Sequence, residues 1–510
     1  MRAARGFASG AALALLGLTG VAHAQRPADT TRAAAYVRDA GPGVVGRLLR
    51  EALARPNVVV MPADTGIVLG RGTDVATTLV VLRGPARLEG RVRGDFIVLG
   101  DLVLRPGAVV EGRAIAIGGE ILNSSLAAVR GERLVFRDVG FAVAAERPET
   151  YALDYRSLER HPVPIVSLPG AFGVRPPGYD RIDGLSIALG PEIALDTGRV
   201  LIDPTVTYRS HLGAVDPAVD VTWQPRRRVT VTARAARETR TDEAWIRGDL
   251  VNAVTSFFAG SDVRNYHRVD RGEATIAREW ETTSGYVTPF IGGLAERAWS
   301  VARDSSARSA PYSVLGRTDR EEGMLRPNPA VSGGRIVSAL GGVRLRVLAG
   351  PVVAAATVRA EVPFGVPDGA RRFVQFTGDG QIAFPTFRTQ HFDAFAHFVG
   401  SSGGPVPSQR YAYVGGSGTI PTMGLLEQGG DELLWLESRY AIPVTAIRLP
   451  FAGSPTVTLR HIVGGAGVSR LPDLTQNVGI RLALAALRID YVIDPAHTGR
   501  HDFGVGVGLR

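Results

Sequence analysis

The sequence predicts an all-β protein: a transmembrane antiparallel β-barrel of about 12 to 16 strands that follows a short periplasmic β-solenoid. Three observations support this prediction. From residue 182 onward strand after strand alternates apolar and polar residues, short apolar runs repeat through residues 78–137, and the chain ends on another alternating strand. In that strand every second residue from Phe503 to Leu509 is apolar, with glycines between them. A closed barrel needs such an ending, because its last strand pairs with its first.

The N-terminus has the features of a secretory signal peptide. Arg2 and Arg5 precede an apolar run over 11–21, and an A-H-A cleavage site ends at Ala24, so we expect residues 1–24 to be removed. The run is shorter than the roughly 20 residues that a membrane-spanning helix needs. No other segment reaches about 18 unbroken apolar residues, which excludes a helical membrane protein.

Composition narrows the classes of partner and site. The sequence contains no cysteine, so we expect neither a disulfide framework nor a cysteine-based metal site. The formal net charge is +9, and a basic chain often binds nucleic acid. Here the basic residues are arginines that occur singly, often at alternate positions of expected strands, and the signal peptide implies export. We therefore expect no nucleic-acid partner.

Residues 25–140 are expected to lie in the periplasm as two units. Residues 25–77 form an N-terminal segment in which apolar residues at helical spacing predict an amphipathic helix over Val44–Ala54. Residues 78–140 repeat with a period of about 16 to 19 residues, and each repeat has an apolar strand followed by a glycine corner. Short strands at a fixed period are typical of a β-solenoid, whose coils bury their apolar faces only by stacking.

The repeat resembles the bactofilin-like, polymer-forming β-helix domains. Their typical motifs appear here as G-R-V-R-G-D at 90–95 and P-G-A-V-V-E-G at 106–112. Hexapeptide-repeat acyltransferases share the solenoid geometry but need a catalytic histidine, and no histidine occurs between His23 and His161. The proline-rich residues 141–180 are interpreted as a linker.

Residues 181–510 are assigned to the barrel. Alternation such as Val229 to Ala235 could also build a soluble β-sandwich, with an apolar core and a polar solvent face. The membrane barrel is favoured because the alternating runs reach about ten residues, against five or six for an average strand. Alanine and glycine are also frequent on the apolar faces. Near the end the apolar parity switches between Leu484 and Leu487, which predicts a tight turn at residues 485–486.

The same region resembles the superfamily of outer-membrane assembly-factor and surface-antigen barrels, which includes two-partner-secretion transporters. Residues 179–185 (Y-D-R-I-D-G-L) resemble the opening of the first barrel strand in that group, and 413–420 (Y-V-G-G-S-G-T-I) resemble the segment that folds back into the lumen. Residues 437–443 (E-S-R-Y-A-I-P) and 487–491 (L-R-I-D-Y) match later strands in the correct order. The resemblance implies that the last strand pairs with the strand at Ile182–Leu189.

Three departures from the superfamily pattern limit what can be transferred. The arginine of the lumen segment would fall at Pro421, and 456–470 lacks the aspartate that normally accepts it, so the usual ion-pair lock is not carried over. The solenoid replaces the usual polypeptide-transport-associated repeats. Some barrels of the superfamily belong to patatin-like autotransporters, which carry a lipase. No G-x-S-x-G nucleophile elbow supports such a lipase in this sequence, so we do not expect that activity.

Charged residues at alternate strand positions would point into the lumen. The lumen-facing candidates are Arg234, Arg344, Arg346, Arg359, Glu361, Glu437, Arg439, Arg481 and Asp490. Bare arginines would make an anion-preferring pore, whereas arginines paired with carboxylates would fill the lumen with a salt-bridge network. The network is favoured, because many bare like charges cannot share one lumen. A second candidate, the lumen-loop motif, consists of Gly415, Gly416, Gly418 and Thr419.

The expected function is that of a non-enzymatic outer-membrane β-barrel of the surface-antigen type, either a channel or a translocation and assembly component. The alternative is a structural envelope anchor, whose solenoid self-assembles or docks to a periplasmic partner. His391 and His397 flank Asp393, but they are interpreted as ordinary lumen residues, and we expect no metal, catalytic residue or cofactor. Expected partners are outer-membrane lipid, lipopolysaccharide, the barrel insertion machinery and further copies of the solenoid.

Overall fold

The computed structural model describes most of the chain after the predicted signal peptide. The described residues are 33–41, 43–62, 66–124, 127–158, 165–226, 228–301, 312–315, 324–349, 351–366, 372–387, 389–447, 454–484 and 487–507. The signal peptide predicted at residues 1–24 lies outside them, as do the last three residues of the predicted closing strand.

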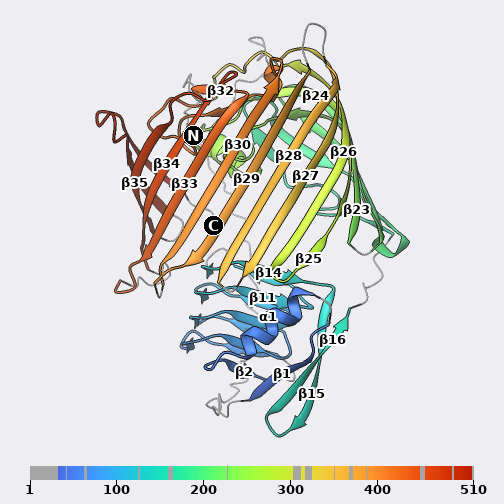
Figure 1. The fold of residues 1–510 in the computed structure, drawn as a ribbon, viewed down its shortest axis with the longest axis vertical. Helices are drawn as coiled ribbons and strands as arrows, with labels where there is room; N and C mark the ends of the chain where they lie inside the picture. The colour runs from blue at the N-terminus through green and yellow to red at the C-terminus, as the bar shows by residue number, and fades with distance from the viewer. Residues whose placement is uncertain are drawn as a thin grey trace, which may run out of the picture.

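The N-terminal domain is a β-solenoid with three parallel sheets (Figure 1). The first sheet contains β2 (Val59–Met61), β5 (Leu79–Val81), β8 (Phe96–Leu99), β11 (Ala114–Ile117) and β14 (Arg133–Phe136). The second contains β3 (Ile67–Leu69), β6 (Ala86–Leu88), β9 (Leu102–Leu104) and β12 (Ile121–Asn123). The third contains β4 (Asp74–Val75), β7 (Arg91–Val92), β10 (Val109–Val110) and β13 (Ala128–Val129).

The solenoid begins one coil earlier than the repeat predicted. The coil of β2, β3 and β4 falls in the segment 25–77 that was assigned to a separate N-terminal unit. It pairs in register with the next coil, with Val59 opposite Leu79 and Ile67 opposite Ala86. The V-x-G corner of the later repeats, such as Val92-Arg93-Gly94, reads Val75-Ala76-Thr77 in this coil. The sequence pattern therefore does not mark the coil, and only its pairing with the next coil identifies it.

A helix and a hairpin complete this domain. The predicted amphipathic helix forms as α1 (Val44–Leu53), and its apolar side packs on the outside of the first sheet, with Leu48 and Leu49 buried. The strand β1 (Ala34–Asp39) pairs in parallel with β16 (Thr150–Ser157), which forms an antiparallel hairpin with β15 (Val139–Arg147). Part of the segment predicted as a linker, 141–180, is therefore a sheet.

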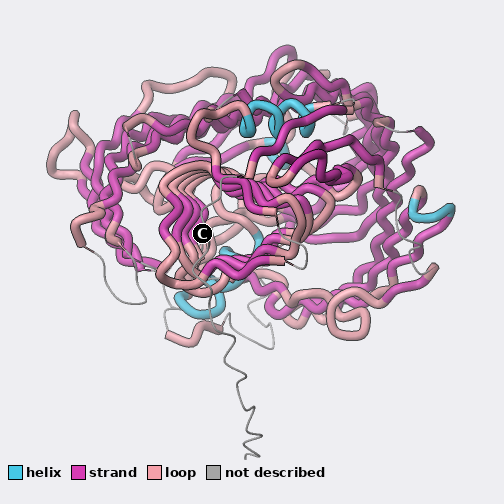
Figure 2. The backbone as a smooth tube through the Cα atoms, turned by 90° about the horizontal axis from the view of Figure 1, so that it is seen from below, coloured by secondary structure: helices cyan, strands magenta, loops and turns pink. Residues whose placement is uncertain are grey.

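The C-terminal domain is one antiparallel sheet of nineteen strands that curls around a lumen (Figures 1 and 2). Its strands are β17 (Val166–Ser167), β18 (Gly178–Asp180), β19 (Gly184–Leu189), β20 (Glu192–Leu195), β21 (Val200–Arg209), β22 (Ala214–Arg226), β23 (Val229–Arg240), β24 (His267–Arg278), β25 (Trp280–Thr282), β26 (Gly285–Ser300), β27 (Gly334–Ala349), β28 (Val352–Gly365), β29 (Phe373–Pro385), β30 (His391–Gly403), β33 (Glu432–Pro443), β34 (Thr456–Gly467), β35 (Thr475–Leu484), β36 (Leu487–Ile493) and β37 (His501–Val507). A 3-10 turn, η1 (Asp196–Gly198), joins β20 to β21.

Sixteen strand paths cross this sheet in the described residues. The short strands β17 and β18 lie along one path opposite β19 and β20, which form a second path, and β25 continues β24. The count is even and falls within the predicted range, as expected for a transmembrane barrel. The parity switch after Leu484 also agrees with the structure, because β35 and β36 pair in antiparallel fashion with Leu484 opposite Leu487; the predicted turn residues 485–486 lie outside the described residues.

The two faces of the sheet carry different residues. Outward side chains such as Leu345, Ile480 and Phe503 are apolar and exposed, whereas the inward positions hold buried ion pairs. This distribution is that of a barrel whose outer face contacts lipid and whose lumen is polar. Neither helix within the described residues is long and apolar enough to cross a membrane.

The strand predicted to close the barrel has a different neighbour. The segment Ile182–Leu189 was expected to pair with the last strand, but β19 is already paired on both edges, with β18 and β21. The first path is instead β17–β18, within the proline-rich stretch. A proline is tolerated there because an edge strand needs no ladder hydrogen bond on its free side. In the described residues β37 pairs only with β36.

The solenoid lies against one mouth of the barrel (Figure 1). Leu348 of β27 is buried in the same apolar cluster as the solenoid residues Ile117 and Leu134. Around this contact, Arg346 forms an ion pair of 2.7 Å with Glu132 of the solenoid. An apolar contact with a charged rim therefore joins the two domains.

Candidate functional site

The lumen contains a segment of the chain that returns from the mouth opposite the solenoid. Residues 404–431, here called the fold-back segment, connect β30 to β33 and include η2 (Ser408–Arg410), β31 (Ala412–Val414) and β32 (Gln428–Gly430). Val414 and Ile420 are fully buried against Trp435 and Ile462 of the barrel wall. The segment is therefore packed onto the inner face of the wall.

The lumen-loop motif forms the turn of this segment. Gly415, Gly416 and Gly418 have φ values of 127°, 75° and 116°, a region that side chains with a Cβ rarely enter. Thr419 closes the turn, because its Oγ1 accepts a hydrogen bond from the Gly415 amide at 2.8 Å. Its carbonyl oxygen accepts a hydrogen bond from Nε1 of Trp435 at 3.2 Å. The four motif residues thus shape and anchor one tight turn.

Arg410 ties the fold-back segment to the barrel wall. Its Nη1 donates to Oε1 of Glu296 at 2.8 Å, and its Nε donates to Oε2 of Glu361 at 3.1 Å. Glu361 also accepts from the Ser338 hydroxyl at 2.7 Å, and Arg271 pairs with the second oxygen of Glu296. All these side chains are buried, and the two carboxylates on β26 and β28 are balanced by two guanidinium groups, Arg410 from the loop and Arg271 from β24.

This contact lies elsewhere than the ion pair that the sequence motif would place at Pro421. Arg410 is eleven residues earlier in the chain than Pro421. Arg410, Glu296 and Arg271 are not among the lumen-facing residues that the sequence predicted. A signal was present, because Arg410 is the single basic residue of the fold-back segment.

A second connection also enters the lumen. Residues 241–266 join β23 to β24 and include α2 (Asp249–Ala259). Trp245 of this connection stacks on His397 of the barrel wall, with ring centroids 4.1 Å apart, and His397 contacts Asp379 at 2.8 Å. A Cβ at Gly418 would meet the side chain of Ile246 at 2.8 Å. The second connection therefore packs against the fold-back segment.

A second charge network lies on the lumen side of the strands β33 to β36. Glu437 accepts from Arg439 and, at 2.7 Å, from Nε of Arg460. Asp490 accepts from Nη1 of Arg460 at 3.0 Å and from Nε of Arg481 at 2.6 Å. Four of the predicted lumen candidates thus meet in one network, with Arg460 as the link between the two carboxylates.

The other predicted lumen residues have separate partners. Arg359 lies 3.4 Å from Glu273, and Arg234 contacts Asp220 and Glu238. Arg344 packs over the ring of Phe290, 4.8 Å from its centroid, and Arg346 pairs with the solenoid as described above. Each predicted arginine therefore has a carboxylate or an aromatic ring beside it.

The structure gives the two histidines separate neighbours. His391 lies 3.4 Å from Asp393, whereas His397 contacts Asp379. In the part of the chain that the structure describes, no group of three histidine, aspartate or glutamate residues is placed to hold a metal ion.

Comparisons with known proteins give matches among solved structures. No protein-family model matches the chain, and no curated protein matches it. BamA from Haemophilus ducreyi lacking POTRA domains 1–3 is similar, with 11% identity, a TM-score of 0.43, and coverage of 72% of this chain and 73% of that chain. CdiB from Escherichia coli (10% identity, TM-score 0.41) and CdiB from Acinetobacter baumannii (11%, 0.37) are also similar. The match covers 72% of this chain in both, and 66% and 65% of those chains.

Proposed function

We propose that this chain is a non-enzymatic outer-membrane β-barrel of the surface-antigen type that acts as a translocation or assembly component. The observation that carries the proposal is the fold-back segment, which lies in the lumen and is tied to the wall by the ion pairs of Arg410 as well as by apolar packing. Side-chain ion pairs between a loop and a wall can separate without breaking the backbone ladder of the barrel. A segment attached in this way can open a path that is closed at rest.

The charges on the inner surface of the barrel would suit the passage of a polar polypeptide. Carboxylates and arginines alternate along the wall beside the fold-back segment, so a polypeptide released into the lumen would meet groups of both signs. The sheet also has a free edge at β37 in the described residues. A free edge can template the addition of another strand, which is a common way for one chain to bind another.

The experiment compares conductance in planar bilayers for the wild type and Arg410→Ala. We expect the wild type to conduct weakly and the variant to open frequently, because the segment loses its ties to Glu296 and Glu361. Arg439→Ala is the matched control, since it removes a lumen arginine that does not touch the fold-back segment. Equal conductance in all three proteins would refute the gating role.

Location is tested on the same protein. A folded barrel should migrate faster on gels before heating than after, and it should fractionate with the outer membrane. A chain that is recovered as a soluble periplasmic protein would overturn the proposal as a whole.

The second candidate function, a structural envelope anchor, rests on the first coil of the solenoid. Its strands β2, β3 and β4 each pair on one side only in the described residues. Such edges allow a second solenoid to stack. Filaments of the detergent-solubilised full chain, together with no conductance from Arg410→Ala, would favour this function over translocation.

A further inference from the structure

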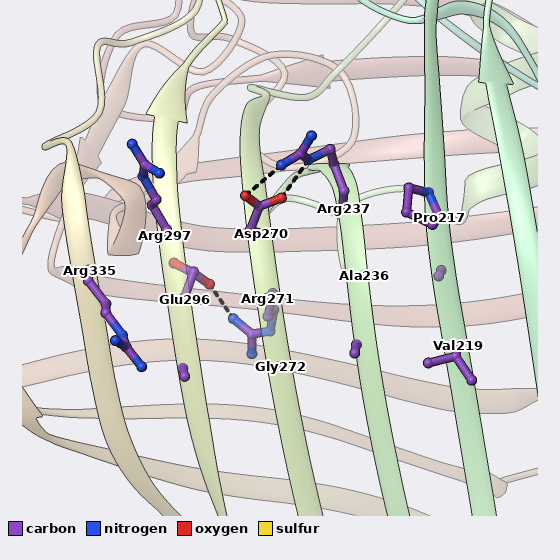
Figure 3. Close-up of a pocket in the computed structure, with 13 residues that line it drawn as sticks. Pro217, Val219, Ala236, Arg237, Asp270, Arg271, Gly272, Glu296, Arg297 and Arg335 are labelled. Carbon is purple, nitrogen blue, oxygen red and sulfur yellow. Dashed lines mark hydrogen bonds and ion pairs between the residues drawn. The ribbon is translucent and has the colours of Figure 1, made fainter.

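A row of four charged side chains crosses the outer face of the barrel near the mouth opposite the solenoid (Figure 3). Arg237 of β23 pairs in register with Asp270 of β24, Asp270 with Arg297 of β26, and Arg297 with Arg335 of β27. The row faces outward, because the residues beside it in sequence, such as Glu296, point into the lumen network.

The row carries more positive charge than its one carboxylate can balance. Both oxygens of Asp270 accept hydrogen bonds from Arg237, whose Nε and Nη2 donate at 2.6 and 2.9 Å. Arg297 and Arg335 are exposed, lie directly opposite each other, and have no ion pair with any described residue. Like charges placed opposite each other on a sheet repel, and a bare arginine against lipid is costly. The pair therefore suits an anion supplied from outside the protein.

A tryptophan on the same face indicates the depth of the four charged residues in the membrane. Trp299 lies two residues beyond Arg297 on the same face, and its ring centroid is 6.0 Å from the guanidinium carbon of Arg237. Tryptophans on the outer face of a barrel concentrate at the boundary between lipid chains and head groups. The arginines thus lie at head-group depth in the leaflet farther from the solenoid.

Below the arginines the outer face is hollowed by small residues. The next row toward the membrane centre is Ala235, Gly272 and Ala295, and the row after it is Ala233, Ala274 and Gly293. On β23, β24 and β26 larger side chains return with Val231, Ile276 and Ile291, the last of which is 67% exposed. Val219 and Val337 flank the first small row on the neighbouring strands. A shallow cavity of about 870 Å³ joins the first small row to the arginines. This trough offers a small-residue, largely apolar floor on which an acyl chain could lie.

We propose that this surface binds a phosphorylated, acylated glycolipid of the lipid A type. Figure 3 shows the side chains of Arg297 and Arg335 extending in opposite directions along their strands. Both side chains are exposed, so rotation about their torsions would bring the two guanidinium groups onto the oxygens of one phosphate. An acyl chain of the same molecule would lie in the trough below. The inference rests on the proposed outer-membrane location, because the leaflet farther from a periplasmic solenoid is the one that contains such a lipid.

The test measures binding by native mass spectrometry of the full chain in detergent, titrated with diphosphoryl lipid A. The double variant R297A/R335A should bind about tenfold more weakly, since it loses the charge-assisted hydrogen bonds to phosphate. The matched control is Arg278→Ala, which removes an outward arginine of β24 that lies 6.0 Å from Trp280 near the other mouth. R297K/R335K should be intermediate, because lysine keeps the charge and loses the planar fork.

A second variant tests the trough independently of charge. A Cβ added at Gly272 would meet nothing within 4 Å, so Gly272→Leu fits the fold and fills the cavity. We expect it to weaken binding of lipid A while leaving binding of inorganic phosphate unchanged.

Three results would overturn the inference. They are equal binding by R297A/R335A and the wild type, equal binding of dephosphorylated lipid A, and equal binding of phosphatidylglycerol. Heat-modifiable migration and fractionation of the same samples separate the two proposals. A correctly located, folded barrel that ignores lipid A refutes only the lipid site.

Discussion

Arg410 and Glu296 join a loop to the barrel wall: Nη1 of the arginine lies 2.8 Å from Oε1 of the glutamate, whose side chain has no exposed surface. The same guanidinium also reaches Glu361 on β28, two strands away from β26. One side chain therefore fixes the fold-back segment relative to three neighbouring strands. Measuring how much this contact stabilises the fold-back segment therefore tests directly how the lumen is closed.

Removing the side chain of Arg410 should lower the stability of the barrel strongly, because it leaves a buried carboxylate without its main partner. Arg410→Ala leaves Glu361 buried with only the hydroxyl of Ser338 and the more distant Arg359 nearby, and breaking a buried pair costs about 3–5 kcal/mol. The midpoint of the heat-modifiable transition should fall accordingly. A double-mutant cycle with Glu361→Gln should give a coupling of about 0.5–3 kcal/mol, and additive effects would show that the pair is not coupled.

The stability of the turn in the fold-back segment should depend on the glycine at position 416 more than on the glycine at position 424. Gly416 has a φ of 75°, and a Cβ there would lie 2.9 Å from the Cα of Leu425. We expect Gly416→Ala to cost about 1–3 kcal/mol and to raise the protease sensitivity of the segment. Gly424→Ala is the matched control, because its Cβ would meet only the flexible carboxylate of Glu427, at 3.1 Å. Equal effects of the two variants would refute this account of the turn.

The solenoid should lose stability in acid through Asp95. Burial raises the pKa of this carboxyl, but the hydrogen bond and charge of Arg113 outweigh it, so the pKa lies below its ordinary value of 3.8. Because the folded pKa is the lower one, Asp95 contributes its full stability above about pH 4, and this contribution disappears as the pH falls through the folded pKa.

The measurement is hydrogen exchange at the amides of β8 and β11, corrected for intrinsic rates, from pH 7 down to acid. Asp95→Asn should lower protection at neutral pH and remove most of the acid dependence. Asp74→Asn provides the control, since Asp74 pairs with Arg93 at the exposed surface. Protection that is unchanged in Asp95→Asn would contradict the prediction.

The docking of the solenoid should depend on an apolar side chain more than on its ion pair. Leu348→Ala removes a buried group from the shared cluster and should cost about 2–5 kcal/mol. Glu132→Gln breaks a partly exposed pair with Arg346, and such pairs contribute about 0–1 kcal/mol. Because the sequence has no cysteine, two engineered cysteines can carry spin labels on the two domains. The distance distribution should broaden for Leu348→Ala and stay narrow for Glu132→Gln; the reverse order would assign the docking to charge.

Much of the fold follows from local patterns. Period-two alternation identified the faces of strands such as β23, β28 and β35, because successive side chains of a strand must point to opposite sides. The parity switch after Leu484 located a hairpin for the same reason. The first coil escaped prediction because only its stacking on the next coil identifies it. The β15–β16 hairpin was missed inside the stretch interpreted as a linker, and β16 also pairs with the distant strand β1, which local periodicity does not specify.

The candidate site was predictable only in part. The sequence by itself determined that arginines and carboxylates recur on one face of the alternating strands, and its motif at 415–419 predicted a segment that folds back into the lumen. The glycine-dependent turn within that segment is visible only in the structure. Only the tertiary structure decided that Arg410 meets Glu296 and Glu361, because those residues are 114 and 49 positions away in the chain. It also decided that β17–β18, and not the strand at 182–189, is the first strand. Contacts of this kind depend on register and on how a loop folds back, which no local periodicity specifies.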